Sequence, residues 1–152
     1  MTDVLVLDAS AAVDAMWRER PHWGLALAAL QGSRATVAPS LLAHEIAHIV
    51  HVKRRRDFAG STEDRSEVVA GILDGVELVE VDVTIARRVG ALAEAERISG
   101  YDAAYLDVAE SREGSMLLTQ DGRLRAAAVG RLGPARCIDL DEAASRLARG
   151  EV

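Results

Sequence analysis

Short apolar runs alternate with longer helix-like segments along this chain, and that alternation limits most strongly the folds it can adopt. Residues 4–7 and 116–119 are almost continuously hydrophobic, as strands buried on both faces of a parallel sheet are. Three further runs have strand character, at residues 35–38, 78–81 and 137–138. Strands that alternate with helices predict an α/β fold, in which helices cover both faces of a mainly parallel sheet.

Between these runs, the spacing of apolar residues predicts helices. Leu42, Ile46 and Ile49 recur at the interval of one helix face. Asp82 or Thr84 is expected to cap a later helix, since both residue types favour that position. We expect helices at about residues 9–17, 21–30, 61–73 and 101–112, with others that begin near residues 39, 82 and 139.

The length and composition indicate one domain with an aliphatic core. The chain has 152 residues and no boundary in composition, so we expect a single domain over residues 1–152. About half of the residues (49%) are hydrophobic but only 3% are aromatic. The N-terminus lacks the pattern of a signal peptide, no apolar run approaches the roughly 20 residues that cross a bilayer, and the single Cys137 excludes an internal disulfide. We therefore expect a cytoplasmic protein without a membrane partner.

Acidic side chains follow two of the predicted strands. Asp8 comes directly after the first strand, and Asp121 lies two residues past Thr119. Because ligands of open α/β sheets bind beyond the carboxyl ends of the strands, both acids are placed for a site. Asp102 begins a helix and Glu45 lies within one. Taken singly, each acid is more often a helix cap or a solvated side chain, and spacing alone does not show that they converge.

If the four carboxylates converge, they need a cation, because unpaired buried charges repel one another. Mg²⁺ and Mn²⁺ prefer such hard oxygen ligands. A bound ion of this kind can polarise a phosphoryl oxygen and activate water for attack. The chemistry that such a cluster favours is metal-assisted hydrolysis of a phosphodiester, with no obligatory histidine or lysine.

Four segments resemble the motifs of PIN-domain nucleases, in the same order and at a similar spacing. They are VLDASA at residues 6–11, PSLLAHEIA at 39–47, YDAAYL at 101–106 and LLTQDGRL at 117–124. The last two are the most specific. Together the four segments resemble the VapC-type toxins of bacterial toxin–antitoxin systems.

The resemblance implies a three-layer α/β/α sandwich with five strands in the order 3-2-1-4-5. It also implies that four carboxylates bind Mg²⁺, with Mn²⁺ as a substitute: Asp8, Glu45, Asp102 and Asp121. The hydroxyl groups of Ser10 and Thr119 would support these ligands through hydrogen bonds.

The function that the resemblance implies is that of a metal-dependent endoribonuclease toxin. Such an enzyme cleaves structured RNA, usually tRNA or ribosomal RNA, and leaves a 5′-phosphate and a 3′-hydroxyl. A VapB-type antitoxin blocks the site, and homodimers are usual. In this family the helices near Trp17 and Trp23 form part of the antitoxin or dimer surface, although core packing is the commoner role of a tryptophan.

The charge of the chain is unusual for a protein that binds RNA. The net charge is -6, whereas nucleic-acid-binding domains are more often basic. Metal-binding carboxylates account for part of it, since bound cations cancel them. Candidate RNA contacts are Lys53, Arg54, Arg55 and Arg123. The run at residues 53–56 is equally well interpreted as a solvated helix end.

Two residues depart from the VapC-type pattern. His48 stands where these toxins commonly have Asn, and Asp107 is an extra acid in a stretch that is usually apolar. The roles of His44, His48 and Asp107 stay open at this point, although the spacing of Asp107 from Asp102 favours a peripheral position.

Three other functions compete with the nuclease. His44-Glu45-x-x-His48 fits the H-E-x-x-H signature of zinc metalloproteases, but no third ligand is marked. A phosphate-transfer domain fits poorly, because Ser10 stands where a dehalogenase-type phosphatase has an acid and the only lysine is Lys53. The third alternative is a PIN-like binding module without activity, against which the presence of all four acids argues.

Overall fold

A parallel five-stranded sheet forms the centre of the protein in the computed structural model, which describes residues 4–16, 20–60 and 64–152. Its strands are β1 (Val4–Leu7), β2 (Ala35–Pro39), β3 (Val76–Val79), β4 (Met116–Leu118) and β5 (Cys137–Ile138). They lie in the order β3-β2-β1-β4-β5, and every neighbouring pair is parallel. The predicted fold class and strand order are confirmed.

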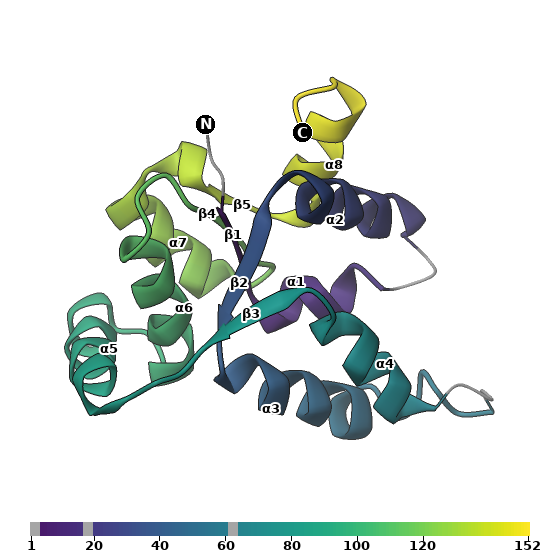
Figure 1. Cartoon of the computed structure of the whole chain (residues 1–152), viewed down its shortest axis with the longest axis horizontal. Coiled ribbons are helices and arrows are strands. Elements are labelled where there is room, and N and C mark those ends of the chain that lie inside the picture. Colours follow the sequence, from purple (N-terminus) through teal and green to yellow (C-terminus); the bar gives the residue numbers. More distant parts are fainter. Residues whose placement is uncertain (1–3, 17–19, 61–63) are drawn as a thin grey trace.

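Helices cover both faces of this sheet. They are α1 (Ala9–Asp14), α2 (Pro21–Ser33), α3 (Leu41–His48), α4 (Arg65–Leu73), α5 (Val83–Glu96), α6 (Gly100–Glu110), α7 (Gly122–Leu132) and α8 (Leu140–Ala148). Figure 1 shows α1 to α4 and α8 to one side of the sheet, and α5, α6 and α7 to the other. A π-helical turn, η1 (Ile49–Lys53), continues α3, and a 3₁₀ turn, η2 (Pro134–Arg136), precedes β5.

Several element boundaries differ from the sequence-based expectation. β3 begins two residues earlier than expected, directly after the turn at Gly75, and as an edge strand it has only partly buried side chains that mark its ends weakly. α7 was not predicted, because its buried stripe consists only of Leu124 and Ala128. The first helix ends at Asp14; Trp17 and residues 61–63 lie outside the described residues.

The two central strands determine where the site can form. Leu5, Val6 and Leu7 of β1 have no exposed surface, because β2 and β4 flank the strand and helices cover both faces. Leu7 pairs with Leu118 of β4, so the two strands end at the same level. The backbone N–H of Asp8 donates to the carbonyl of Leu118 at 3.1 Å and extends this register by one residue. The residues after β1 and β4 therefore leave the sheet side by side.

Trp23 joins α2 to the C-terminal helix. The residue is only 8% exposed, and its Nε1–H donates to Asp141 Oδ1 of α8 at 2.8 Å. The guanidinium carbon of Arg20 lies 4.3 Å from the centre of the indole ring, a cation–π arrangement. These contacts fit the core-packing interpretation of Trp23 rather than a surface role.

Asp107 forms a buried ion pair with Arg88 between α6 and α5. The residue is 7% exposed, and its two carboxylate oxygens accept from Nε and Nη2 of Arg88, each at 2.9 Å. This two-point geometry is the strong form of an arginine–carboxylate contact. It explains how an acid occupies a stretch that is otherwise apolar, and it gives Asp107 a structural role.

We expect Arg88→Ala to lower the melting temperature by several degrees, and by more than Asp107→Ala does. The first change leaves a buried carboxylate without its partner, whereas the second places an apolar side chain in an apolar helix face and leaves Arg88, which is half exposed, in water. Thermal unfolding of the two single variants and the double variant at neutral pH measures the difference. Equal losses in the two single variants would contradict this account of the pair.

Candidate metal centre

Asp8 lies at the point where the strand order reverses, between the ends of β1 and β4. Asp8 is only 5% exposed, and its Oδ2 accepts hydrogen bonds from two hydroxyl groups. One comes from Ser10 in the first turn of α1, and the other from Thr119, directly after β4, at 2.7 Å. Both donors are neutral, so they orient the carboxylate without cancelling its charge.

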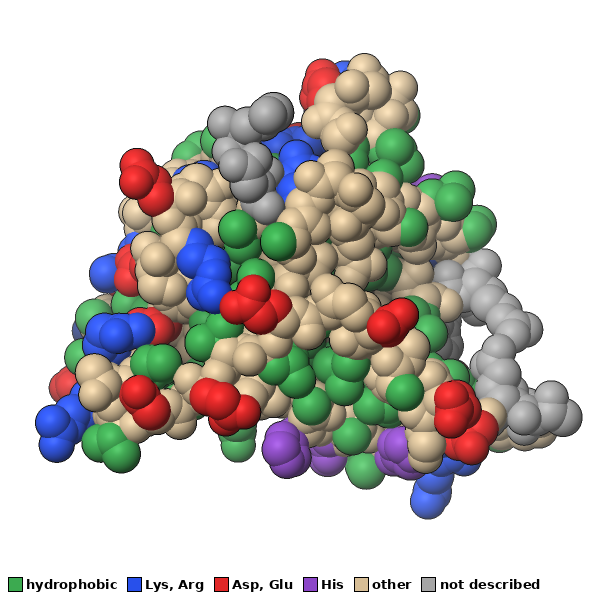
Figure 2. Space-filling view, in the orientation of Figure 1, with side chains coloured by type: hydrophobic (Ala, Val, Ile, Leu, Met, Phe, Trp, Pro, Cys, Tyr) green, Lys and Arg blue, Asp and Glu red, His purple; other side chains and the backbone are tan. Residues whose placement is uncertain are grey.

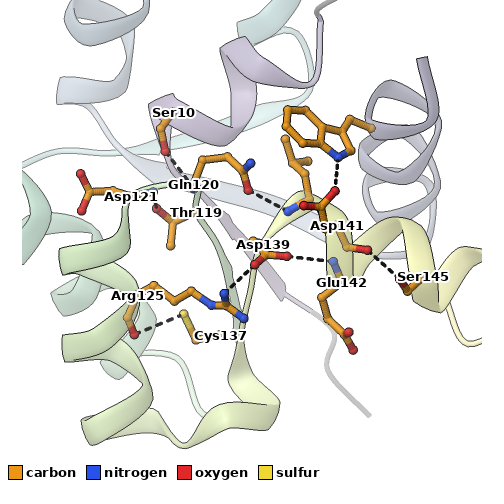
Figure 3. Close-up of polar contacts among 12 residues, drawn as sticks. Ser10, Thr119, Gln120, Asp121, Arg125, Cys137, Asp139, Asp141, Glu142 and Ser145 are labelled. Atoms are coloured by element: carbon orange, nitrogen blue, oxygen red, sulfur yellow. Dashed lines mark hydrogen bonds and ion pairs between the residues drawn. The ribbon is translucent and has the colours of Figure 1, made fainter. Parts of the chain in front are cut away.

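Further hydrogen bonds tie the loops after β1 and β4 together. The N–H of Gln120 donates to Ser10 Oγ at 3.0 Å, and the N–H of Asp121 donates to Thr119 Oγ1 at 3.0 Å. The side-chain carbonyl of Gln120 accepts from the N–H of Leu140, the first residue of α8, at 2.8 Å. Figure 3 shows Gln120 between Ser10 and the start of α8. The hydroxyls that contact Asp8 are thus themselves held in place.

Glu45 reaches the same region from α3. Its Oε2 accepts a hydrogen bond of 2.5 Å from the hydroxyl of Tyr105, which lies on α6 and has no exposed surface. Sequence analysis did not assign Tyr105 a role. The two residues are 60 positions apart, so only the tertiary structure brings them together.

Asp102 lies in the first turn of α6, three residues before Tyr105. It is not the cap of that helix, because Ser99 Oγ accepts from the N–H of Asp102 at 3.0 Å and fills that role. Asp102 is partly exposed. Its negative charge acts on both Asp8 and Glu45. The structure therefore brings these three acids within electrostatic reach of one another.

Asp121 lies beside this group and also caps a helix. Its Oδ1 caps α7 by accepting from the N–H groups of Arg123 and Leu124, at 2.8 and 2.9 Å. Its connection to Asp8 runs through Thr119, whose hydroxyl contacts both residues. The capping interpretation that the sequence left open thus applies to Asp121, and this acid lies at the edge of the group rather than within it.

No cationic side chain pairs directly with the four acids in the described part of the chain. Burial raises the pKa of Asp8 above its ordinary value, and the charge of Asp102 adds to that rise, while the hydroxyls of Ser10 and Thr119 oppose it. Burial likewise raises the pKa of Glu45, with Asp8 and Asp102 contributing and Tyr105 opposing. In the described part of the chain, none of the four acids takes part in an ion pair.

The donor set fits a hard divalent cation in its chemistry, although the side chains do not yet enclose one. Carboxylate oxygens with raised pKa values and no cationic partner are the ligands that Mg²⁺ or Mn²⁺ takes in proteins. Among residues 4–16, 20–60 and 64–152, however, no group of three or more His, Cys, Asp or Glu side chains is arranged to hold a metal. The described acids therefore lie near one another, but three or more of them do not yet meet around a common point.

The histidines of α3 lie on its solvent-exposed surface. His44 and His48 are exposed, whereas Glu45 is partly buried against Tyr105. Figure 2 shows histidine side chains along one edge of the surface, in the region of α3. The described residues also offer no third ligand that would complete a zinc site with this pair. The geometry therefore gives no support to the zinc protease interpretation of the H-E-x-x-H segment.

The four candidate RNA-contacting residues differ in their surroundings. Arg54 is bound to Asp14 of α1 at 2.5 Å, and it lies 3.8 Å from Asp57. Lys53, Arg55 and Arg123 are exposed. Lys53 is distinguished by its effect on Glu45, since its positive charge opposes the rise in the pKa of that carboxyl that burial causes. Of the four, Lys53 has the clearest relation to the acids.

Comparisons with known proteins agree with this arrangement. A family model described as PIN domain matches residues 5–130. Among solved structures, the crystal structure of PAE2754 from Pyrobaculum aerophilum is similar, with 25% sequence identity, a TM-score of 0.67 and coverage of 98% of this chain and 99% of that one. No curated protein sequence matches. PIN domains are generally nucleases and typically use divalent metal ions. Because the family match covers most of the chain, including all four acids, this protein belongs to the PIN-domain family and has its nuclease-type fold.

Proposed function

We propose that this protein is a metal-dependent endoribonuclease, and that it acts as the toxin of a toxin–antitoxin pair. The proposal combines the PIN-domain family with the acid cluster at the carboxyl ends of β1 and β4. In it, the whole chain forms one nuclease domain. The substrate is RNA, with tRNA or ribosomal RNA as the expected class.

One observation carries the proposal: Asp8 is buried beside other carboxylates and is stabilised only by neutral donors. Its environment raises its pKa by burial and by the charge of Asp102. A buried carboxylate without a cationic partner lowers the stability of the metal-free protein. Proteins retain destabilising groups of this kind at functional sites. A divalent cation would remove the cost, which is why the arrangement favours metal binding over a purely structural role.

In the proposed mechanism, the residues of this chain bind and orient. Mg²⁺, or Mn²⁺ in its place, would be held by Asp8, Glu45, Asp102 and Asp121, and when bound it would supply Lewis-acid activation of water and of the scissile phosphate. Ser10 and Thr119 fix the orientation of the Asp8 carboxylate through their hydroxyls. No side chain needs to act as a nucleophile.

Lys53 is the best-placed candidate for contact with an RNA phosphate. The N–H of Arg54 donates to the carbonyl of Ile49 at 2.7 Å, the wider hydrogen-bonding interval of a π-helical turn. Because each residue of such a turn rotates less than in an α-helix, Lys53 comes closer to the helix face that carries Glu45. Arg55 and Arg123 remain secondary candidates, while Arg54 is engaged with Asp14.

The toxin role and its partners rest on the likeness to VapC-type proteins. A VapB-type antitoxin, a homodimer and a cytoplasmic location are parts of the proposal. Among the described residues, no helix is long and apolar enough to cross a membrane.

We expect Asp8→Asn to reduce cleavage of RNA at least about 100-fold while the fold is retained, because the amide cannot replace a charged metal ligand. The assay follows cleavage of purified tRNA and ribosomal RNA with Mg²⁺ or Mn²⁺. Asp82→Asn is the matched control, since this acid caps α5 and does not contribute to the raised pKa of Asp8 or Glu45, and Asn caps equally well. Full activity in the Asp8 variant would refute its assignment as a ligand. Binding of RNA by the wild type without cleavage would favour the inactive binding module.

The same substitution should raise stability in the absence of metal. Because the folded state raises the pKa of Asp8 above its ordinary 3.8, ionisation of this acid destabilises the folded state. This loss of folding stability is absent below the ordinary pKa of Asp8. It grows as the pH rises through the raised pKa of Asp8 in the folded state. Metal-free Asp8→Asn should therefore melt a few degrees higher than the wild type at pH 7, and by a smaller margin near pH 4. Added Mg²⁺ or Mn²⁺ should stabilise the wild type only, and a lower melting temperature of the metal-free variant at pH 7 would contradict the argument.

We expect Lys53→Ala to weaken RNA binding several-fold, to a similar degree for different RNA sequences, because it removes one phosphate contact. The slope of log affinity against log salt should fall by about one. Arg87→Ala, which removes an exposed cation from α5 on the other side of the sheet, is the control and should change neither value. Binding to an uncleavable RNA measured at several salt concentrations tests both variants, and identical slopes for Lys53→Ala and the wild type would exclude the contact.

A further inference from the structure

Tyr105 contacts the acid cluster without being exposed to any substrate. Its ring is fully buried, and its hydroxyl donates to Glu45 Oε2 at 2.5 Å. A buried tyrosine needs a hydrogen-bond partner for its hydroxyl, and most find a backbone carbonyl, another side chain or water. Here the acceptor is one of the four acids themselves, which gives the contact a consequence for the metal site.

We propose that Tyr105 is a positioning residue that holds Glu45 in the orientation in which it binds the metal. The inference rests on the proposed metal-dependent function. The hydroxyl of Tyr105 donates a hydrogen bond to Oε2 of Glu45, so Oε1 is the oxygen that remains to bind the cation. Glu45 then contributes one ligand oxygen in a fixed direction instead of sampling several rotamers.

The position of Tyr105 in its helix supports this role. Asp102 and Tyr105 are three residues apart on α6, an interval that places both on one face of the helix. One helix thus supplies an acid of the cluster and also the group that holds another acid, Glu45 of α3. Since α6 packs directly on β1, β2 and β4, this arrangement fixes Glu45 relative to Asp8 through a single rigid element.

The chemical type of the donor matters as much as its position. A phenol keeps its proton at physiological pH, so the Tyr105 hydroxyl is the donor in its contact with Glu45. A lysine or arginine at this place would orient Glu45 equally well but would neutralise it and compete with the cation. A neutral phenol orients the carboxylate and leaves its charge available to a metal.

The test is Tyr105→Phe, which keeps the ring in the core and removes only the hydroxyl. Mn²⁺ binding to the metal-free protein is measured by isothermal titration calorimetry, and RNA cleavage is followed as a function of metal concentration. We expect the Kd for Mn²⁺ to rise by about 10- to 100-fold, the range typical of groups that orient metal ligands. Cleavage should recover in large part at saturating metal, with the KM for RNA unchanged.

Two further variants separate a positioning role from a structural one. Ser115→Ala removes another fully buried hydroxyl, one that donates to the carbonyl of Ala109 and contacts no acid. It should lower stability without changing the Kd for Mn²⁺. Glu45→Gln should weaken Mn²⁺ binding by itself, and adding Tyr105→Phe to it should have little further effect, because Tyr105 acts through Glu45.

The outcomes distinguish this inference from the function on which it rests. If the wild type binds Mn²⁺ and Glu45→Gln weakens binding, but Tyr105→Phe binds as the wild type does, the positioning role is wrong and the proposed metal site stands. Equal effects of Tyr105→Phe in the wild type and in Glu45→Gln would also overturn it. If the wild type binds no Mn²⁺, or Glu45→Gln leaves binding unchanged, the assignment of the metal site itself fails and the role of Tyr105 fails with it.

Discussion

The hydrogen bonds that hold the Asp8 carboxylate between the ends of β1 and β4 are the interaction on which the site depends. β1 is the middle strand of the sheet and is fully enclosed, so the residue that follows it emerges into a largely buried place. Ser10 and Thr119 satisfy the polarity of Asp8 there but leave its charge. Strand order, burial and unneutralised charge are thus linked, because moving β1 to an edge would expose Asp8 to water, which would stabilise its charge.

Neutral donors also orient the carboxylates of the other acids and leave their negative charge intact. Glu45 is held by the phenol of Tyr105, and Asp121 by the N–H groups that begin α7. Positive side chains are absent from these contacts, whereas elsewhere the molecule uses them freely, as in the pair of Arg88 with Asp107. This contrast separates the acids that form ion pairs from the four that we propose as metal ligands.

Sequence patterns predicted those features that depend on local order, and missed those that depend on distant packing. The strand before Asp8 was predicted correctly because continuous burial leaves a continuous apolar run. The resemblance named Ser10 and Thr119 beside Asp8, and both hydroxyls contact its carboxylate, while the metal-binding role of the four acids stays a prediction. The contact of Tyr105 with Glu45 joins residues of two helices that are 60 positions apart in the sequence, and no sequence periodicity predicts it. The π-helical turn at Lys53 could not be predicted from the sequence either. Its residues continue the apolar spacing of α3, and only the hydrogen-bond interval changes.

The distribution of ion pairs bears on how an acidic chain would bind RNA under the proposed function. Several arginines bind carboxylates away from the cluster: Arg88 to Asp107, Arg125 to Asp139, Arg131 to Glu96 and Glu110, and Arg146 to Glu142. Each of these pairs is close to neutral, so the paired arginines offer little net attraction to a phosphate backbone. Attraction then has to come from a few exposed cations such as Lys53 and from metal bound by the acids. Under the proposed function, Asp8 and its neighbours would hold a divalent cation whose positive charge offsets theirs, so RNA binding should be weak without metal and stronger with it.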